Sequence, residues 1–242
     1  MSITKSLPRL AIVTALKEEM AAVEAAIPVA DRKDVLLIRG GVGWNAAVRV
    51  ANELNRLPQL PAIVCSTGFC GGVVERLDHG SVLLVTEILG EDAPIRLKVG
   101  FEASELEVFS NAISSTGISL YRGAIFTAKR AVIKVDEKQR LAQAWQVSAV
   151  DMETYAIAST LKSGMRFFGL RAVSDTVRDE LPAEVGGFLD DKGNLRVGNI
   201  ARFAMGGRDN LKTLWNLKVR ADKAAACLTA AWKAVWPVLV EV

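Results

Sequence analysis

The chain has 242 residues, of which 50% are hydrophobic and 24% are charged, and its 30 basic and 27 acidic residues give a formal net charge of +3. This composition excludes a disordered chain, and it gives no strong overall electrostatic signal for nucleic acid or an anionic membrane, so a small molecule is the expected partner. The hydrophobic fraction is large enough to form a core, and we expect one α/β domain over residues 1–242.

Cysteine and histidine are scarce. Cys65, Cys70 and Cys227 form no Cys-x-x-Cys pair, and His79 is the single histidine, so the ligand spacing of a zinc site is missing. We therefore expect reduced cysteines, no metal and no cofactor. The apolar run near the N-terminus ends at Lys17, too early for a secretory signal, and no apolar stretch reaches the roughly 20 residues of a membrane helix. These features predict a cytoplasmic protein without a membrane span.

In chain order, short apolar or β-branched runs alternate with segments of helical periodicity. The runs predict strands over 10–15, 35–40, 62–68, 81–89, 120–128, 149–152 and 167–175. The periodic segments predict helices over 18–27, 44–57, 138–145 and 152–164. Because several strands are apolar on both faces, the sequence predicts an α/β three-layer sandwich, with a central sheet covered by helices.

The C-terminal part, from Leu181 onward, has turn dipeptides and short helical pieces, followed by a predicted helix over 210–236. The apolar stripe of this helix consists of Leu211, Leu214, Lys218, Ala221, Ala225, Leu228, Trp232 and Val235. Such a stripe is typical of a seam that faces the core. The alternative is that its tryptophans line a partner interface or hold an apolar ligand tail.

Ser174 and Asp175 end a predicted strand. Ligands of open α/β sheets bind outside the carboxyl ends of strands, which places Asp175 where it meets a substrate. An N-cap or turn role explains an aspartate at this position equally well.

Two carboxylates, Asp151 and Glu153, flank Met152 in an otherwise apolar segment. A buried carboxylate costs roughly several kcal/mol unless it is paired or hydrogen-bonded, so the segment suggests a ligand with hydroxyls or positive charge. Two positions of separation point the side chains to different sides. We expect one to face a ligand and the other to cap a helix or form an ion pair.

Glycine-rich turns follow two predicted strands, at 40–43 and at 67–72, and the second contains Phe69 and Gly71. Glycines let the backbone approach a ligand, although tight turns explain them equally well. Neither turn matches the Gly-x-Gly-x-x-Gly pattern, and this disfavours a nicotinamide-cofactor fold.

Several motifs together resemble the nucleoside phosphorylase and nucleosidase superfamily along nearly the whole chain. They are ALKEEM (15–20), GVGWNAA (41–47), STGFCGG (66–72), HGSVLLVTE (79–87), AVDMETYAIA (149–158) and RAVSD (171–175). The resemblance implies a phosphorylase/hydrolase-like fold with a central mixed sheet. It also implies cleavage of the N-glycosidic bond of a purine nucleoside, and a homo-oligomer, with a homodimer expected.

Within the superfamily, two branches are indicated. ALKEEM is similar to the start of the 5′-methylthioadenosine/S-adenosylhomocysteine nucleosidases. The segments 128–138 and 181–215 resemble the hopanoid-associated phosphorylases, which are implicated in removing adenine from adenosylhopane. Both branches imply a 5′-substituted adenosine as the substrate.

The resemblance assigns roles to the motif residues. Asp175 would protonate the purine N7, and Ser174 would support the position of Asp175. Glu153 would accept hydrogen bonds from the ribose 2′- and 3′-hydroxyls and stabilise positive charge on the sugar, while Met152 would pack against the ribose. Asp151 would be a supporting residue.

The nucleophile is the open step. Glu19 stands where the nucleosidases hold their nucleophilic water, and the usual phosphate contacts of the phosphorylases are missing. Phe69 occupies the turn position that usually carries a serine or threonine, and we expect it to stack on the sugar or shape the 5′ pocket. The alternative is that phosphate is the nucleophile and binds at an atypical site built from Thr67, Arg39 and Arg130.

The leading hypothesis is therefore hydrolytic release of adenine from a 5′-modified adenosine, with Glu19 as the general base. The alternative reaction is phosphorolysis of a similar nucleoside, for example a hopanoid-linked adenosine, which gives a ribose 1-phosphate. A third hypothesis is a nucleoside-binding module without catalysis.

Overall fold

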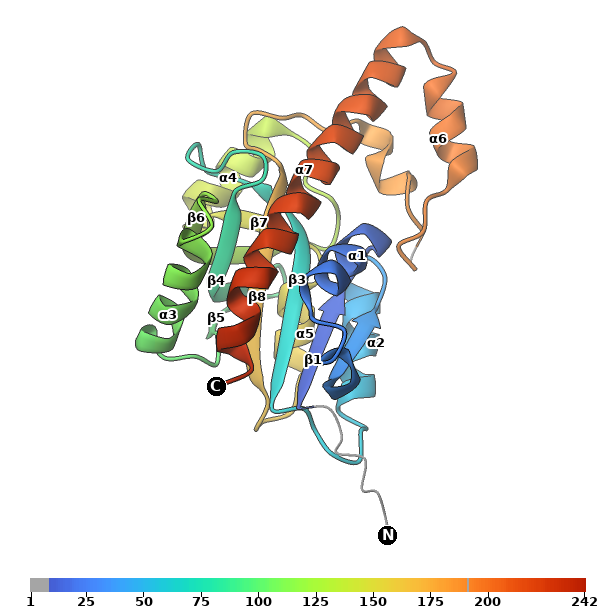
Figure 1. The fold of residues 1–242 in the computed structure, drawn as a ribbon. Coiled ribbons are helices and arrows are strands. Elements are labelled where there is room, and N and C mark those ends of the chain that lie inside the picture. The colour runs from blue at the N-terminus through green and yellow to red at the C-terminus, as the bar shows by residue number, and fades with distance from the viewer. Residues whose placement is uncertain (1–8, 191) are drawn as a thin grey trace.

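The computed structural model describes residues 9–190 and 192–242. In this part of the chain, eight strands form one mixed sheet with helices on both faces (Figure 1). The arrangement confirms the predicted three-layer sandwich with a central mixed sheet.

The sheet has the order β2-β1-β3-β7-β6-β4-β5, and β8 pairs with both β3 and β4. Successive pairings of β3, β8, β4, β6 and β7 return to β3, so these strands form a closed ring. The strands are β1 (Leu10–Thr14), β2 (Val35–Arg39), β3 (Ile63–Gly72), β4 (Val82–Gly90), β5 (Ala93–Lys98), β6 (Leu120–Thr127), β7 (Ala149–Asp151) and β8 (Arg166–Asp175).

Helices α1, α3 and α7 lie together on one face of the sheet, and α2 packs with α5 on the other (Figure 1). The helices are α1 (Lys17–Ala26), α2 (Trp44–Leu54), α3 (Ala103–Ser114), α4 (Val135–Trp145), α5 (Thr154–Thr160), α6 (Val197–Ala204) and α7 (Arg208–Leu239). Two short 3-10 turns, η1 (Arg32–Asp34) and η2 (Ala183–Gly187), complete the described elements. None of the helices in the described residues is long and apolar enough to cross a membrane.

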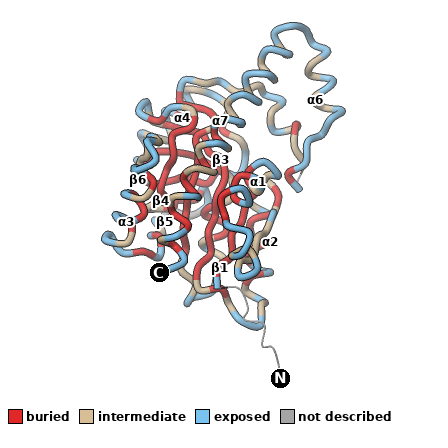
Figure 2. The backbone as a smooth tube through the Cα atoms, viewed as in Figure 1, coloured by how far each residue is buried: buried red, intermediate tan, exposed pale blue. Residues whose placement is uncertain are grey.

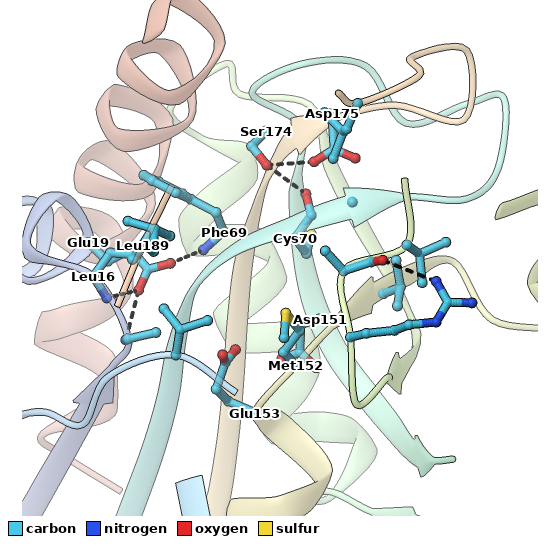
Figure 3. A pocket seen from close by; sticks show the side chains of 18 residues that line it. Leu16, Glu19, Phe69, Cys70, Asp151, Met152, Glu153, Ser174, Asp175 and Leu189 are labelled. Atoms are coloured by element: carbon cyan, nitrogen blue, oxygen red, sulfur yellow. Dashed lines mark hydrogen bonds between the residues drawn. The ribbon is translucent and has the colours of Figure 1, made fainter. Parts of the chain in front are cut away.

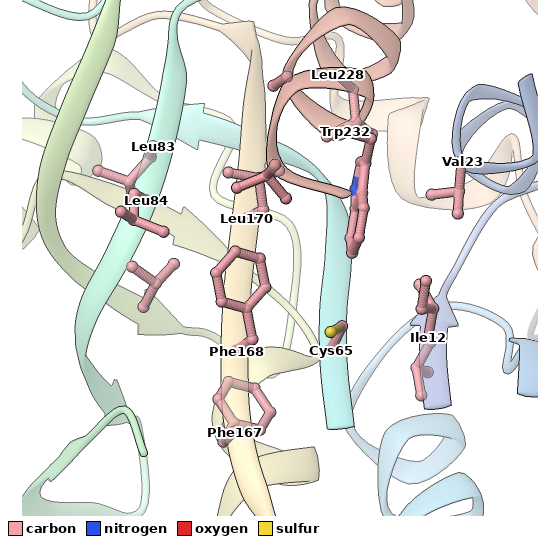
Figure 4. Packing of buried hydrophobic residues seen from close by; sticks show 14 of the residues in the cluster. Ile12, Val23, Cys65, Leu83, Leu84, Phe167, Phe168, Leu170, Leu228 and Trp232 are labelled. Atoms are coloured by element: carbon pink, nitrogen blue, oxygen red, sulfur yellow. The ribbon is translucent and has the colours of Figure 1, made fainter. Parts of the chain in front are cut away.

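The second half of α7 is a central part of the core (Figures 2 and 4). Trp232 is fully buried against Phe168 of β8, with their ring centroids 6.1 Å apart. The Trp232 indole N–H also donates to Thr67 Oγ1 at 2.9 Å, which satisfies its polar atom inside the core. Removal of such a side chain typically costs about 3–5 kcal/mol of stability, so this contact fixes α7 on the sheet.

The first half of α7 departs from the predicted seam. Leu228, Trp232 and Val235 face the core as expected, but Leu211 and Lys218 are exposed. Here α7 extends beyond the sheet and joins α6 (Figures 1 and 2). We call residues 192–220 the α6–α7 arm. The seam therefore covers only the part of the helix that has a sheet beneath it.

Candidate functional site

The structure brings all seven predicted site residues to one cavity of about 160 Å³ at the carboxyl ends of β1, β3 and β8 (Figure 3). Figure 3 shows Asp175 and Glu153 at two ends of this cavity, with Met152 between them and Glu19 to one side. We call it the site cavity. The predicted residues that line it are Glu19, Phe69, Gly71, Met152, Glu153, Ser174 and Asp175.

Glu19 lies in the first turn of α1, directly after β1, and its side chain is buried. Its Oε2 accepts hydrogen bonds from the backbone N–H groups of Ala15 at 2.8 Å and Leu16 at 2.9 Å, and its Oε1 accepts one from Phe69 at 2.7 Å. Burial raises the pKa of the Glu19 carboxyl above its usual range, while these donors oppose the shift. The result is a fixed, poorly solvated carboxylate with the character of a base.

Gly68 permits the approach of Glu19 to β3. A Cβ atom at position 68 would lie 2.4 Å from Glu19 Oε1, so any larger residue would displace the carboxylate. The same segment then supplies the Phe69 N–H to Glu19. The glycine at this turn is therefore explained by the close contact between the backbone and the Glu19 carboxylate.

Glu153 lies in the turn between β7 and α5 and is partly buried. Its Oε1 accepts the Gly43 N–H at 2.7 Å, from the other predicted glycine-rich turn. Burial, and then repulsion from Asp151, raises the pKa of Glu153 to about 8. Hydroxyl donors or a positive charge close to this carboxyl would lower its pKa and favour the ionised form.

Asp151 forms an ion pair with Arg171 of β8, with Oδ2 and Nη2 2.7 Å apart, and both side chains are almost fully buried. Asp151 also accepts hydrogen bonds from the hydroxyls of Thr127 and Thr154. Asp151 and Glu153 both line the site cavity, and Asp151 is the one that forms an ion pair, in agreement with the expectation that one of the two would do so.

Asp175 ends β8 and is paired with a residue that the sequence analysis did not assign to the site. Lys138 of α4 is fully buried, and its Nζ lies 2.5 Å from Asp175 Oδ2. On the other carboxylate oxygen, the Ser174 hydroxyl donates to Asp175 Oδ1 at 2.9 Å. Both oxygens of Asp175 thus have a fixed partner, and Ser174 makes the expected contact.

Gly71 makes room for Asp175. A Cβ atom at position 71 would lie 2.9 Å from Asp175 Oδ2 and 3.3 Å from Val150 Cγ1. Its contribution to the site is therefore the absence of a side chain beneath the carboxylate.

A second, much smaller cavity of about 10 Å³ lies beside Glu153, and Thr14 and Arg171 also line it. Among the described residues, Thr14 Oγ1 and Arg171 Nε are the buried side-chain polar atoms without a hydrogen-bond partner. A space of this size holds about one water molecule, and buried water typically bonds to polar groups of this kind. The small cavity is thus suited to one water molecule.

The three residues of the alternative phosphate site, Thr67, Arg39 and Arg130, do not point into one common site. Thr67 is buried, and its hydroxyl donates to the Leu170 carbonyl. Arg39 is exposed and donates to Asn194 Oδ1, while Arg130, at the edge of the site cavity, pairs with Glu137. Within residues 9–190 and 192–242, no group of three or more His, Cys, Asp or Glu side chains is arranged to hold a metal ion.

An apolar cavity of about 530 Å³ adjoins the site cavity. Leu16, Phe69, Asp175 and Leu189 are among the residues that line both. The remaining wall is mostly apolar and comes from the segment after β8, from α6 and from the first half of α7. Its residues include Val185, Phe188, Leu195, Ile200, Leu214, Leu217 and Ala221.

Comparisons with known proteins agree with the motifs. A family model described as the phosphorylase superfamily matches residues 9–204. A 5′-methylthioadenosine/S-adenosylhomocysteine nucleosidase of Staphylococcus aureus is 26% identical over 174 residues, which cover 65% of this chain and 75% of that protein.

Two solved structures share the fold. One is a nucleosidase of the same name from Helicobacter pylori, with butyl-thio-DADMe-Immucillin-A, at a TM-score of 0.71 and 17% identity over 98% of this chain and 100% of that one. The other is futalosine hydrolase from the same organism, at a TM-score of 0.70 and 16% identity over 98% and 99%.

Proposed function

The chain belongs to the phosphorylase superfamily, and on this premise we propose that it hydrolyses the N-glycosidic bond of a 5′-modified adenosine and releases adenine. Cleavage of this bond develops positive charge on the ribose and negative charge on the leaving purine. A suitable site therefore needs a proton donor near the base and carboxylates near the sugar.

The observation that carries the proposal is the arrangement of three carboxylates around one cavity. Asp175 and Glu153 lie at two ends of the site cavity, and Glu19 lies to the side (Figure 3). In the proposed complex, Asp175 protonates the purine N7 and Ser174 holds its carboxyl. Glu153 accepts hydrogen bonds from the ribose hydroxyls, with Met152 against the sugar and Phe69 between the sugar and the 5′ group.

Water is favoured over phosphate as the nucleophile. Four of the residues that line the site cavity carry carboxyl groups, namely Glu19, Asp151, Glu153 and Asp175, and these offer a phosphate anion no positive charge. Arg130, the basic residue on the same wall, forms an ion pair with Glu137, so its charge is already paired. Glu19, with its raised pKa, lines the site cavity and is suited to take a proton from water.

The deciding experiment measures adenine release from 5′-methylthioadenosine in phosphate-free buffer, with and without added phosphate. We expect release without phosphate and free 5-methylthioribose as the second product. An absolute requirement for phosphate, with formation of 5-methylthioribose 1-phosphate, would establish phosphorolysis instead. Tight nucleoside binding with no turnover under either condition would identify a binding module.

A matched pair of variants tests the role of Glu19. Glu19→Gln is expected to lower the rate of hydrolysis by roughly 10²–10⁴-fold, because an amide cannot accept the proton of the attacking water. Glu24→Gln removes the same charge from an exposed position of α1 outside both cavities and should leave the rate unchanged. Equal rates for the two variants would remove Glu19 from the mechanism.

The apolar cavity favours an apolar group on the 5′ carbon. It opens from the site cavity at Leu16 and Phe69, and a hopanoid-linked adenosine belongs to the compounds that would use it. A series of 5′-alkylthioadenosines is expected to gain about fourfold in kcat/KM for each added methylene until the cavity is full. A fall in kcat/KM with chain length would contradict this assignment.

A homodimer and a cytoplasmic location remain predictions from the family resemblance. Light scattering on the purified protein measures its mass against the 26.1 kDa of one chain. A mass of twice this value is the expected result.

A further inference from the structure

The α6–α7 arm carries an unusual share of the exposed apolar surface. In the described part of the chain, ten large hydrophobic residues are exposed, and six of them lie in this arm. The six are Leu195, Val197, Met205, Leu211, Trp215 and Val219. Such clustering is atypical of a surface that faces only water.

The arm is also strongly basic. Residues 192–220 contain seven of the 30 basic residues and one of the 27 acidic residues, which leaves 23 basic and 26 acidic residues elsewhere. Lys218 pairs with Asp222 and Arg220 with Asp179, whereas Arg208 and Lys212 form no ion pair within the described part of the chain. The small net charge of the whole chain therefore conceals a local cationic surface.

The apolar residues in the first half of α7 form two separate faces. Leu214, Leu217 and Ala221 line the apolar cavity. Leu211, Trp215 and Val219 recur every four positions, which places them within about 80° of one another on the helix and outside that cavity lining. Trp215 is 66% exposed and Met205, just after α6, is 80% exposed.

Basic side chains accompany the outward face. At 3.6 residues per turn, Arg208 and Lys212 project on the same side of α7 as Leu211 and Trp215, and both are exposed. A helix surface that combines tryptophan, aliphatic residues and cations is typical of segments that lie in the interface of a bilayer.

We propose that the α6–α7 arm docks on an anionic lipid surface. The side chains of Trp215, Leu211 and Met205 enter the boundary between headgroups and acyl chains, and Arg208 and Lys212 bind lipid phosphates. Against a second copy of the arm, the same cations would meet like charge. A nucleic acid would use the charge but leave the apolar stripe uncovered.

Docking of the arm would determine the location of the protein at a lipid surface. This proposal does not depend on the proposed reaction. Leu214 and Leu217, on the cavity side of the same helix, lie within about one helix diameter, or about 10 Å, of the docked face. The arm would therefore hold the apolar cavity close to the bilayer.

The test is co-sedimentation of the full chain with vesicles of phosphatidylcholine alone and of phosphatidylcholine mixed with phosphatidylglycerol. We expect binding to the mixed vesicles, little binding to phosphatidylcholine alone, and weaker binding at high salt. Lipid binding is measured without substrate, so a failure to bind would not argue against the proposed reaction. In the same way, a failure to cleave nucleosides would not argue against lipid binding.

Two variants with matched controls assign the binding to the arm. Arg208→Gln with Lys212→Gln should weaken binding by roughly 30-fold, since each cation near the surface contributes separately. The same charge change at Lys33 and Arg56, exposed residues outside the arm, should have a much smaller effect. Trp215→Ser should weaken binding by about tenfold, whereas Val29→Ser, at a residue that is 76% exposed, should not change it.

Three outcomes would overturn the proposal. The first is no binding of the unaltered chain to phosphatidylglycerol vesicles at low salt. The second is equal loss of binding in the arm variants and their controls. The third is a change in oligomeric mass with Trp215→Ser and no change in lipid binding, which would assign the outward face to a second copy. Thermal unfolding of each variant verifies that it is folded.

Discussion

Lys138 Nζ lies 2.5 Å from Asp175 Oδ2, and it also donates to the backbone carbonyls of Thr176 at 2.8 Å and Asp179 at 3.0 Å. All three ammonium hydrogens therefore have acceptors inside the protein, and one of these acceptors is the proposed acid. Helix α4 thus fixes the position of the carboxyl that ends β8.

Lys138→Met is expected to lower the free energy of unfolding by about 3–5 kcal/mol, because it leaves Asp175 as a buried carboxylate without its partner. It should also lower kcat. Denaturant unfolding and steady-state kinetics measure the two effects.

A double-mutant cycle separates the ion pair from general damage. Combined with Asp175→Asn, the change at Lys138 should cost less stability than it does alone, since the two residues act as a unit. Lys134→Met, on an exposed residue just before α4, is the control and should change neither quantity. Strict additivity of the two substitutions would contradict the coupling.

Asp175→Asn is expected to lower the rate of adenine release by roughly 10²–10⁴-fold while the fold survives, because an amide cannot supply the proton to the purine. The rate is measured by following free adenine. Asp136→Asn makes the same substitution on the exposed side of α4 and should keep the original rate. Unchanged turnover in Asp175→Asn would exclude this residue as the acid.

The raised pKa of Glu153 predicts a dependence of stability on pH. Because this pKa is about 8 in the folded chain against an ordinary value of 4.5, the folded state binds more protons than the unfolded state between these values. The stability contribution is therefore present below pH 4.5 and is lost as the pH rises toward 8, at roughly 1 kcal/mol per pH unit.

Glu153→Gln removes this titration. Unfolding curves measured across that pH range should show the variant gaining stability relative to the original chain as the pH rises, whereas Glu18→Gln should show no such trend. Parallel pH profiles for the original chain and Glu153→Gln would show that Glu153 does not titrate in this range.

Gly71→Ala tests how closely β3 must approach the acid. The added methyl would lie 2.9 Å from Asp175 Oδ2, so the carboxyl must move and kcat should fall by about 10²-fold. Gly186→Ala places its methyl in open space and is the control. Full activity in Gly71→Ala, measured by adenine release, would show that Asp175 tolerates displacement.

Most of the sheet could be predicted because its strands are local apolar runs. The predicted strands correspond to β1, β2, β3, β4, β6, β7 and β8, although β3 extends further, to Gly72. The sequence analysis missed β5 (Ala93–Lys98), which follows acidic residues and contains Pro94 and Arg96, so it lacks an apolar run. It also missed α3, although Leu106, Phe109 and Ile113 have helical spacing and are buried there.

The site residues that share motifs could be found from the sequence, but their partners could not. Lys138 lies within a segment predicted to be helical, and its partner is 37 positions away, so only the packing of α4 against the end of β8 brings them together. Arg171 carried a usable signal. An arginine inside an apolar strand requires a buried partner, and Asp151 is that partner.

The closed ring of β3, β8, β4, β6 and β7 has a consequence for how such a chain diversifies. The ring contains the two strands that end at Asp151 and Asp175, whereas the apolar wall proposed to contact the 5′ group comes mainly from the segment between β8 and the buried half of α7. Insertions or substitutions in that segment can therefore change which 5′ group the protein accepts, while the carboxyl groups proposed for bond cleavage keep their positions.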